Sequence, residues 1–293
     1  MPSGKRARQQ RQQAAPPPVR SKGAPGLGAR QASPRVLAIA GGVVLLVVIA
    51  IVLAVVLSGG KSPNNGSNDG PTISIADGTP TVGSSNQSTN PNVLLGAADV
   101  ERLLKGIPQT GFRLGKATAP VTLVEYIDLQ CPDCDAFETT EFAPLVEKYV
   151  RPGKLKIMIQ PWSILDRTPD IHDSDRGQRA TIAAAAQNKA FNFAQVLYDN
   201  QGTEGTGWLN DAMISNIAAS VDGLKPYQLA TDASSAETRS IVRNITDFAN
   251  SHPAQMTGTP TLYLGKGLAT PQWFFTGVPD LGTLEAAIDA RLK

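Results

Sequence analysis

Both cysteines of the chain, Cys131 and Cys134, lie where a strand pattern gives way to a helix pattern. Residues 121–129 form a nearly continuous apolar run, which is typical of a strand covered on both faces. A helix pattern follows, with Pro132 allowed in its first turn, and residues 154–161 predict a second strand. Strand, helix and strand over about 40 residues predict a right-handed parallel βαβ unit with the thiols at its first turn.

The roles open to this cysteine pair differ in what else they require of the chain. A disulfide scaffold needs several pairs closing long loops, and this sequence has two cysteines. A zinc site needs a second pair of ligands at short spacing, whereas the two histidines, His172 and His252, are eighty residues apart. We therefore favour dithiol–disulfide redox chemistry, with an inert staple or part of a metal site as alternatives.

A long apolar run near the N-terminus divides the chain into two parts. Residues 36–57 contain no charged or polar side chain, and a helix of this length would be roughly 33 Å long, enough for a bilayer core of about 30 Å. A cleaved signal peptide would have a shorter apolar core and a small-residue cleavage site, so we expect an uncleaved signal-anchor. The first 60 residues contain eight Lys or Arg and no acid. The positive-inside rule then predicts a cytoplasmic N-terminus and an extracytoplasmic remainder.

Composition predicts how the other segments behave. Residues 1–35 are rich in Gln, Pro, Arg, Ala and Gly, which indicates a disordered basic tail. Residues 58–92 are mostly Gly, Ser, Asn, Thr and Pro, which indicates a flexible linker. The folded part is expected at 93–293, and residues 61–293 together contain 25 acidic and 19 basic residues. A nucleic-acid binder usually carries its basic charge on the folded domain, so we expect no nucleic-acid partner.

The order of elements within the folded part predicts an insertion. Helical periodicity dominates residues 166–251, and strand patterns return at 261–264 and 272–276 before a last helix that opens at Asp280 or Thr283. The other predicted elements are a helix at 99–105, a strand at 112–114, a helix at 133–149 kinked at Pro144, a helix at 208–220, and a helix opened by a capping box of Ser234 and Glu237.

The position of the cysteines at a helix N-terminus gives them different chemistry. Unpaired N–H groups and the helix dipole favour a thiolate at Cys131, whereas a free thiol with a pKa of about 8.5 is only a few per cent ionised at pH 7. Cys134, one turn later, would be shielded yet near enough to resolve a mixed disulfide. Glu125, on the strand below, could pass protons to and from the inner thiol. Its alternative is a structural, salt-bridged glutamate.

Thr259 and Pro260 precede a predicted strand. The proline could simply break a loop. In the cis form it would also turn the backbone of Thr259 outward, and an extended substrate peptide could then pair with that edge beside Cys131.

Three segments together resemble a known family. They are Glu125-Tyr-Ile-Asp-Leu-Gln-Cys-Pro-Asp-Cys134, the preceding Leu114-Gly-Lys-Ala-Thr-Ala-Pro120, and the distant Gly258-Thr-Pro-Thr261. The combination is similar to the DsbA-like thioredoxin-fold oxidoreductases, above all their membrane-anchored bacterial branch. The resemblance covers residues 93–293 and implies an α/β thioredoxin fold with an inserted helical domain, preceded by one transmembrane helix.

The resemblance also implies roles for individual residues and partners. Cys131 would be the attacking cysteine, Cys134 the resolving one, Glu125 the buried acid and Pro260 the cis proline. The expected partners are exported proteins with free cysteines, and a quinone-linked membrane oxidase that recycles the disulfide. No bound cofactor is implied. Some relatives bind calcium, but the sequence has no clear calcium loop.

One departure from the family concerns the two residues between the cysteines. The strongly oxidising members carry a histidine where this chain has Asp133, after Pro132. An anion within a turn of Cys131 should raise the pKa of that thiol and oppose the helix dipole. We therefore predict that Pro132 and Asp133 modulate the pair and that the protein is a milder oxidant than the histidine-bearing members.

Taken together, these features predict an extracytoplasmic thiol–disulfide oxidoreductase that oxidises rather than reduces its substrates. A reductase or isomerase is the alternative of the same chemistry, since direction depends on the reduction potential and the recycling partner. The alternative of a different class is a redox-inert thioredoxin-like chaperone that binds peptides at the Pro260 edge, although such a module needs neither thiol.

Overall fold

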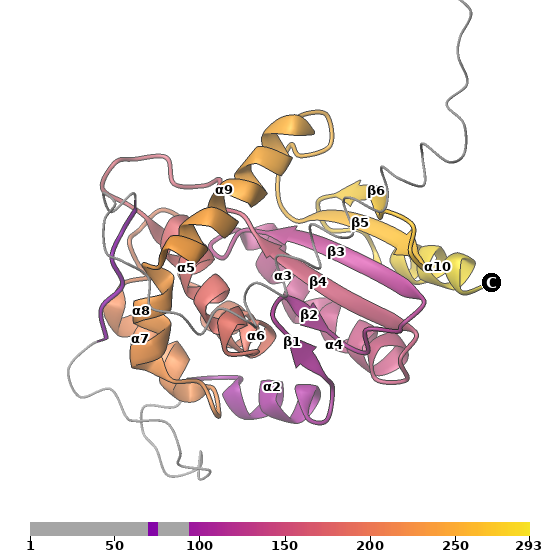
Figure 1. Cartoon of the computed structure of the whole chain (residues 1–293), viewed down its shortest axis with the longest axis horizontal. Coiled ribbons are helices and arrows are strands. Elements are labelled where there is room, and N and C mark those ends of the chain that lie inside the picture. Colours follow the sequence, from indigo (N-terminus) through magenta and orange to yellow (C-terminus); the bar gives the residue numbers. More distant parts are fainter. Residues whose placement is uncertain (1–69, 76–93) are drawn as a thin grey trace, which may run out of the picture. The chain divides into compact units, whose positions relative to one another are not determined.

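The computed structural model describes residues 70–75 and 94–293 (Figure 1). The predicted tail at 1–35, the predicted membrane span at 36–57 and most of the predicted linker lie outside these ranges. Among the residues that are described, no helix has both the length and the apolar character needed to cross a bilayer.

A mixed sheet forms the centre of the described region. Its strands lie in the order β1-β2-β4-β3-β5-β6, and β3 pairs in parallel with β4 and antiparallel with β5. The strands are β1 (Gln109–Thr110), β2 (Arg113–Leu114), β3 (Val121–Ile127), β4 (Leu155–Pro161), β5 (Thr261–Lys266) and β6 (Gln272–Thr276). The parallel β3–β4 pair, joined by a helical crossover, confirms the predicted βαβ unit. The predicted strand near 112–114 is the second strand of a short hairpin.

The helices follow the predicted sequence of a crossover, an insertion and a final helix. They are α2 (Ala97–Leu104), α3 (Pro132–Thr140), α4 (Phe142–Leu145), the π-helical η2 (Val146–Val150), α5 (Asp173–Ala186), α6 (Ala190–Tyr198), α7 (Asp211–Ser220), α8 (Pro226–Ala233), α9 (Ala236–Ser251) and α10 (Leu281–Leu292). In Figure 1, α5 to α9 are grouped toward the end of the sheet away from α10. These five helices form the insertion predicted between the βαβ unit and the terminal hairpin.

The predicted helix at 133–149 is divided. Helix α3 ends at Thr140, α4 begins at Phe142, and the π-helical turn follows. Pro144 lacks the N–H that would bond to the carbonyl of Thr140, and its ring crowds that carbonyl. The interruption therefore falls one turn before the proline, where the sequence predicted a kink.

Several helix boundaries of the insertion differ from the sequence prediction. The helix predicted at 208–220 begins at Asp211, because the Asn210 side chain caps it by accepting from the N–H of Met213. The hydroxyl of Ser235, rather than that of Ser234, caps α9 by accepting from the N–H of Thr238 at 3.0 Å. Ser234 instead ends α8, a helix that the sequence analysis did not separate. Helix α10 begins as predicted, because the Asp280 carboxylate accepts from the N–H of Thr283 at 2.9 Å.

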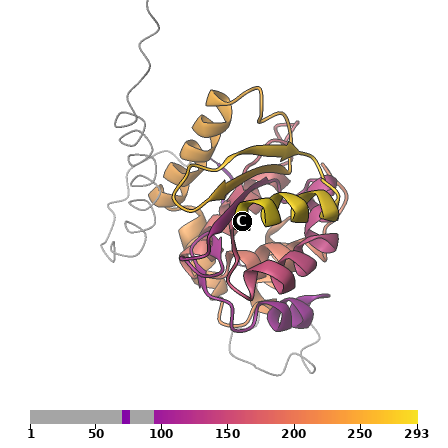
Figure 2. The same cartoon turned by 90° about the vertical axis from the view of Figure 1, so that its right-hand side faces the viewer.

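The two faces of the sheet are covered by different helices, and Figure 2 shows α9 and α10 on opposite sides of it. On the α9 face, Phe248 stacks on Tyr126 with ring centroids 5.1 Å apart, and both rings meet Tyr263 edge-on. On the other face, Leu284 and Ile288 of α10 join the larger apolar core. Strand β3 is thus buried from both sides, as its continuous apolar run predicted.

Six residues from the range predicted as linker are described, and they pack against the insertion. Ile73 is buried in the main apolar core. The guanidinium of Arg176 on α5 donates to the carbonyl oxygen of Thr72 at 3.2 Å. Ile73 is one of few apolar residues in the range 58–92, and its burial holds residues 70–75 to the folded body.

Candidate active site

Cys131 lies at the start of α3, just beyond the end of β3. It is the N-cap residue, with extended backbone angles, and its N–H donates to the carbonyl of Asp128 at 3.1 Å. Both cysteines are free thiols in this structure. Cys131 keeps 7% of its surface exposed, whereas Cys134, one turn into the helix, is completely buried. The chain therefore presents one sulfur to solvent and hides the other, as the sequence predicted.

The two thiols have opposite acid–base properties. The pKa of Cys131 is lowered from 9.0 to about 6, chiefly by a hydrogen bond from the Cys134 thiol. Burial opposes this shift, and Thr259 and the backbone N–H groups of Cys134 and Asp133 add to it. Burial raises the pKa of Cys134 well above 9, and the hydrogen bond that it donates to Cys131 raises it further. Near neutral pH the pair therefore holds one thiolate, at Cys131, and one thiol.

Asp133 acts on this pair through its backbone in the structure. Its N–H is among the groups that lower the pKa of Cys131. Its side chain is exposed and lies at the edge of the groove described below. The prediction that its carboxylate raises the pKa of Cys131 stays a prediction.

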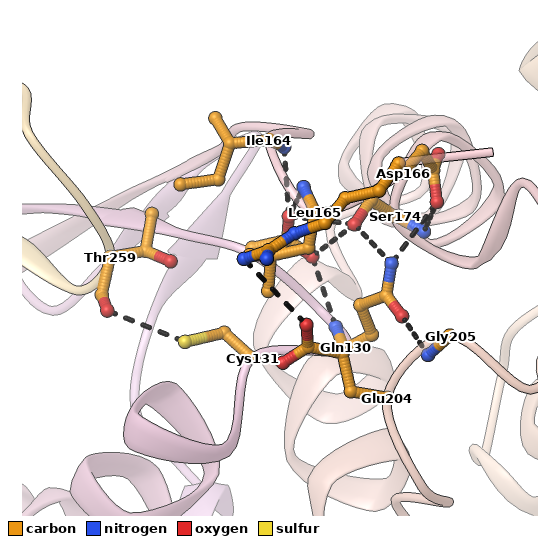
Figure 3. A network of polar contacts seen from close by, with 11 residues as sticks. Gln130, Cys131, Ile164, Leu165, Asp166, Ser174, Glu204, Gly205 and Thr259 are labelled. Atoms are coloured by element: carbon orange, nitrogen blue, oxygen red, sulfur yellow. Dashed lines mark hydrogen bonds and ion pairs between the residues drawn. The ribbon is translucent and has the colours of Figure 1, made fainter.

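A groove opens beside Cys131, and Thr259 forms part of its wall. The Thr259–Pro260 peptide bond is cis, as the family resemblance implied. In its protonated form the Cys131 thiol donates to the Thr259 carbonyl, and the two atoms are 3.3 Å apart in the contact drawn in Figure 3. The groove has a volume of about 700 Å³. Its lining includes the apolar side chains of Trp162, Ile164, Leu165 and Met256, and the charged side chains of Asp133, Arg167 and Glu204.

Glu125 is completely buried on β3, between Ile159 of β4 and Leu262 of β5. No hydrogen-bond donor meets either of its carboxyl oxygens in the part of the chain that the structure describes, so the salt-bridge alternative has no partner there. Burial, and then the charge of Glu138, raise its pKa well above 4.5. Burial therefore favours the protonated, neutral form of this carboxyl group.

Sequence reasoning missed Glu138, which is also buried. Burial raises its pKa to about 8, against a hydrogen bond from the side-chain amide of Gln195 that lowers it. Glu138 follows Cys134 by four residues on α3, so both face the same side of the helix. That spacing was the signal in the sequence that could have identified it.

Sequence reasoning also missed a polar network that holds the loop before Cys131, shown in Figure 3. Gln130 is completely buried. Its side-chain amide donates to Asp166 at 3.0 Å and to the Ser174 hydroxyl at 2.7 Å, and its carbonyl oxygen accepts from the N–H of Gly205 at 2.9 Å. The available signal was two polar residues, Asp128 and Gln130, beside an apolar run. Their partners are too distant in sequence to be inferred from it.

Comparisons with known proteins agree with this site. The thioredoxin family model matches residues 108–274, more than half of the chain. A probable disulfide bond formation protein D of Bacillus anthracis is 29% identical over 183 residues, which are 61% of this chain and 77% of that protein. The disulfide bond formation protein D of Bacillus subtilis is 23% identical over 159 residues, 52% of this chain and 66% of that protein.

Solved structures share the fold. The crystal structure of oxidised BdbD from Bacillus subtilis superposes with a TM-score of 0.53 at 20% identity, covering 64% of this chain and 97% of that one. The crystal structure of alpha-DsbA1 from Wolbachia pipientis gives a TM-score of 0.51 at 19% identity, covering 66% and 95%. With its asymmetric dithiol at the start of α3, the chain therefore belongs to the thioredoxin family and is a DsbA-like thiol–disulfide oxidoreductase.

Proposed function

We propose that this oxidoreductase introduces disulfides into exported proteins that carry free cysteines. The observation that carries the proposal is the difference between the two thiols. A thiol whose pKa is about 6 is a stable thiolate at neutral pH, and stabilising the reduced dithiol makes the corresponding disulfide a stronger oxidant.

The proposed reaction begins from the oxidised Cys131–Cys134 pair. A substrate thiolate attacks the sulfur of Cys131, the intramolecular disulfide breaks, and Cys134 leaves and takes up a proton. A second substrate thiolate then attacks the substrate sulfur of this mixed disulfide and expels Cys131 as a thiolate. The substrate loses two electrons and gains a disulfide, and the enzyme gains the two electrons as a reduced dithiol.

Three groups have proposed roles around these steps. Glu125, buried and protonated, supplies the proton that Cys134 needs as a leaving group. Thr259 and Pro260 offer a backbone edge beside Cys131 for an extended substrate peptide. Pro132 and Asp133 set the thiolate stability from within the motif.

The proposed location is outside the cytoplasmic membrane. Residues 36–57 would anchor the chain with its N-terminus in the cytoplasm, because the basic residues precede the apolar run. A quinone-linked membrane oxidase would then accept the two electrons and restore the disulfide. Protease added to intact cells should remove the folded part and leave the N-terminal segment, and a version lacking residues 1–57 should leave the membrane fraction. Protection of the folded part in intact cells would refute this location.

The decisive experiment determines whether the protein oxidises or reduces its substrates. We expect a reduction potential, from equilibrium with glutathione, between about −120 mV and about −200 mV, and a largely oxidised pair in cells. A potential near about −270 mV with a reduced pair in cells would identify a reductase. If a variant without either cysteine still protects substrate proteins as well as the wild type, the protein is instead the redox-inert peptide-binding chaperone.

A further inference from the structure

Asp128 is a buried acid that the reaction above does not use. It is completely buried in the loop between β3 and Cys131. Its carboxylate accepts from the N–H groups of Ile164 at 2.9 Å, Leu165 at 3.2 Å and Gln130 at 3.1 Å. The hydroxyl of Ser174, at the start of α5, lies 2.7 Å and 2.8 Å from the two carboxylate oxygens. One side chain therefore joins the active-site loop, the segment after β4 and the helical insertion.

The backbone of the same residue contacts both thiol-bearing residues. The carbonyl of Asp128 accepts from the N–H of Cys131 at 3.1 Å and from the hydroxyl of Tyr198 at 3.1 Å. The N–H of Asp128 hydrogen-bonds to the sulfur of Cys134 and so works against the raised pKa of that thiol. A displacement of Asp128 would therefore change the surroundings of both cysteines.

The residues that hold the carboxylate also form the groove. Ile164 and Leu165 line the groove and lie across from Cys131 in Figure 3. Their N–H groups donate to the Asp128 carboxylate. Gln130 ties the same network to Gly205, next to Glu204 of the groove edge. The groove wall and the thiols are thus connected through one buried residue.

We propose that Asp128 is a positioning residue that couples the peptide-binding groove to the dithiol. It holds the Ile164–Leu165 wall at the right distance from Cys131, and it fixes the backbone that bonds to Cys131 and Cys134. The inference deepens the proposed function, on which it rests, because it presumes that the groove receives the substrate chain beside its cysteine.

Asp128→Asn tests the coupling. An amide cannot accept from all four donors, because one oxygen becomes an N–H donor. We expect KM for a dithiol peptide to rise about tenfold, as expected when a charge-assisted hydrogen bond is lost, with a smaller change in kcat. We also expect the pKa of Cys131, followed by thiolate absorbance, to rise because the N-cap backbone is less firmly held.

Ser174→Ala separates positioning from charge. It removes one donor to Asp128 and one acceptor for the Gln130 amide, and it leaves the carboxylate in place. Positioning predicts changes in KM and in the pKa of Cys131 of the same sign as in Asp128→Asn, with KM up about threefold. If Asp128→Asn does not fold, Ser174→Ala decides alone, because loss of one hydroxyl is a milder change.

Asp173→Asn is the matched control. Asp173 is also buried, and its carboxylate accepts from the N–H groups of Gly207 at 2.9 Å and Leu209 at 3.0 Å, within the insertion. We expect it to lower thermal stability without changing KM or the pKa of Cys131. The proposal is overturned if folded Asp128→Asn or Ser174→Ala keeps both wild-type values, or if Asp173→Asn changes them equally.

These measurements remain informative if the direction of electron flow is wrong. The pKa of Cys131 and the affinity for a peptide with serines in place of its cysteines can be measured for an oxidase, a reductase or an isomerase. A potential near that of thioredoxin would reject the oxidase, whereas unchanged peptide affinity in both network variants would reject the coupling.

Discussion

The two sides of the dithiol can be compared directly, since one helix supplies both sulfurs. The groove side, formed by Cys131 and Thr259, keeps some exposure and is rich in donors that stabilise a thiolate. On the buried side, Cys134 is completely enclosed, and two buried acids that interact with each other, Glu125 and Glu138, have raised pKa values. Cys131, which favours the thiolate, is therefore one helical turn from Cys134, which like Glu125 and Glu138 favours its protonated form.

The difference shows how two neighbouring cysteines acquire different pKa values and therefore different roles in the active site. At the first position of a helix, N–H groups without backbone partners bond to sulfur and lower its pKa. One turn further in, burial penalises negative charge, and the thiol keeps its proton. Attack on and release from substrate should therefore occur at Cys131, while proton transfer should occur on the buried side.

The largest effect is expected from removing each sulfur in turn. Cys131→Ala should abolish exchange, because no accessible nucleophile remains. In Cys134→Ala, the Cys131 thiolate can still attack a substrate disulfide and expel one of its sulfurs, but the neighbouring thiol that could displace the bound substrate is gone, so substrates should accumulate as mixed disulfides on Cys131. Non-reducing electrophoresis with and without reductant detects these adducts. Equal trapping by both variants would contradict the division between the two sides.

Glu125→Gln tests proton transfer on the buried side. Loss of a positioned acid should slow the step that protonates or deprotonates Cys134 by about 10²-fold. Stability near neutral pH should change little, because the neutral amide replaces a neutral acid. Stopped-flow kinetics of disulfide reduction measures this step.

Glu147→Gln is the matched control for that experiment. Glu147 is a largely exposed glutamate of η2 that pairs with Arg151, so the rate should stay at the wild-type value. If Glu125→Gln loses stability and rate in equal measure, the role of Glu125 is structural.

Glu138→Gln should alter the pH dependence of stability. The pKa of Glu138 is about 8 in the folded protein, against 4.5 for an ordinary glutamate. Folding therefore takes up a proton between about pH 4.5 and pH 8, and the free energy of unfolding falls as pH rises through this window. The variant lacks this contribution. Relative to the wild type it should become more stable as pH rises from 5 to 8, as measured by urea unfolding of the reduced protein. Parallel stability curves would refute the assignment.

The smallest effect is expected from Asp133→His, on the groove side. Asp133 is exposed, so solvent weakens its interaction with Cys131. We expect the pKa of Cys131 to fall by less than about one unit, where one unit corresponds to about 1.4 kcal/mol or roughly 30 mV. Thiolate titration measures the shift, and Asp133→Asn distinguishes loss of the anion from gain of the imidazole. A pKa that is unchanged or higher in the histidine variant would reject a modulating role for the carboxylate.

Local sequence patterns predicted most of the fold. The continuous apolar run of β3 indicated a strand buried from both sides, and Pro144 indicated an interruption in the crossover helix. The start of α9 was assigned one residue too early, because Ser234 and Ser235 are both good caps. Which serine caps depends on where the preceding helix ends.

The parts of the candidate site that depend only on residues close in sequence were predicted. The Cys-x-x-Cys spacing and its position at a helix start require only neighbouring residues, and they determine which sulfur is exposed. The cis form of Pro260 followed from the family resemblance. Glu138 was missed because an acid on a helix is usually solvated, and only packing shows that this one is buried.

The sequence by itself determined that two thiols stand at the start of a helix, and hence that their roles differ, because the helix end and its dipole are properties of the local chain. Only the tertiary structure decided which other groups surround each thiol. It buried Glu125 and Glu138 out of water, which raised their pKa values, and it brought Thr259 to the sulfur of Cys131. It also joined Asp128 to Ile164 and Ser174. Burial and contacts between distant segments depend on the packing of the whole domain, and no local pattern encodes them.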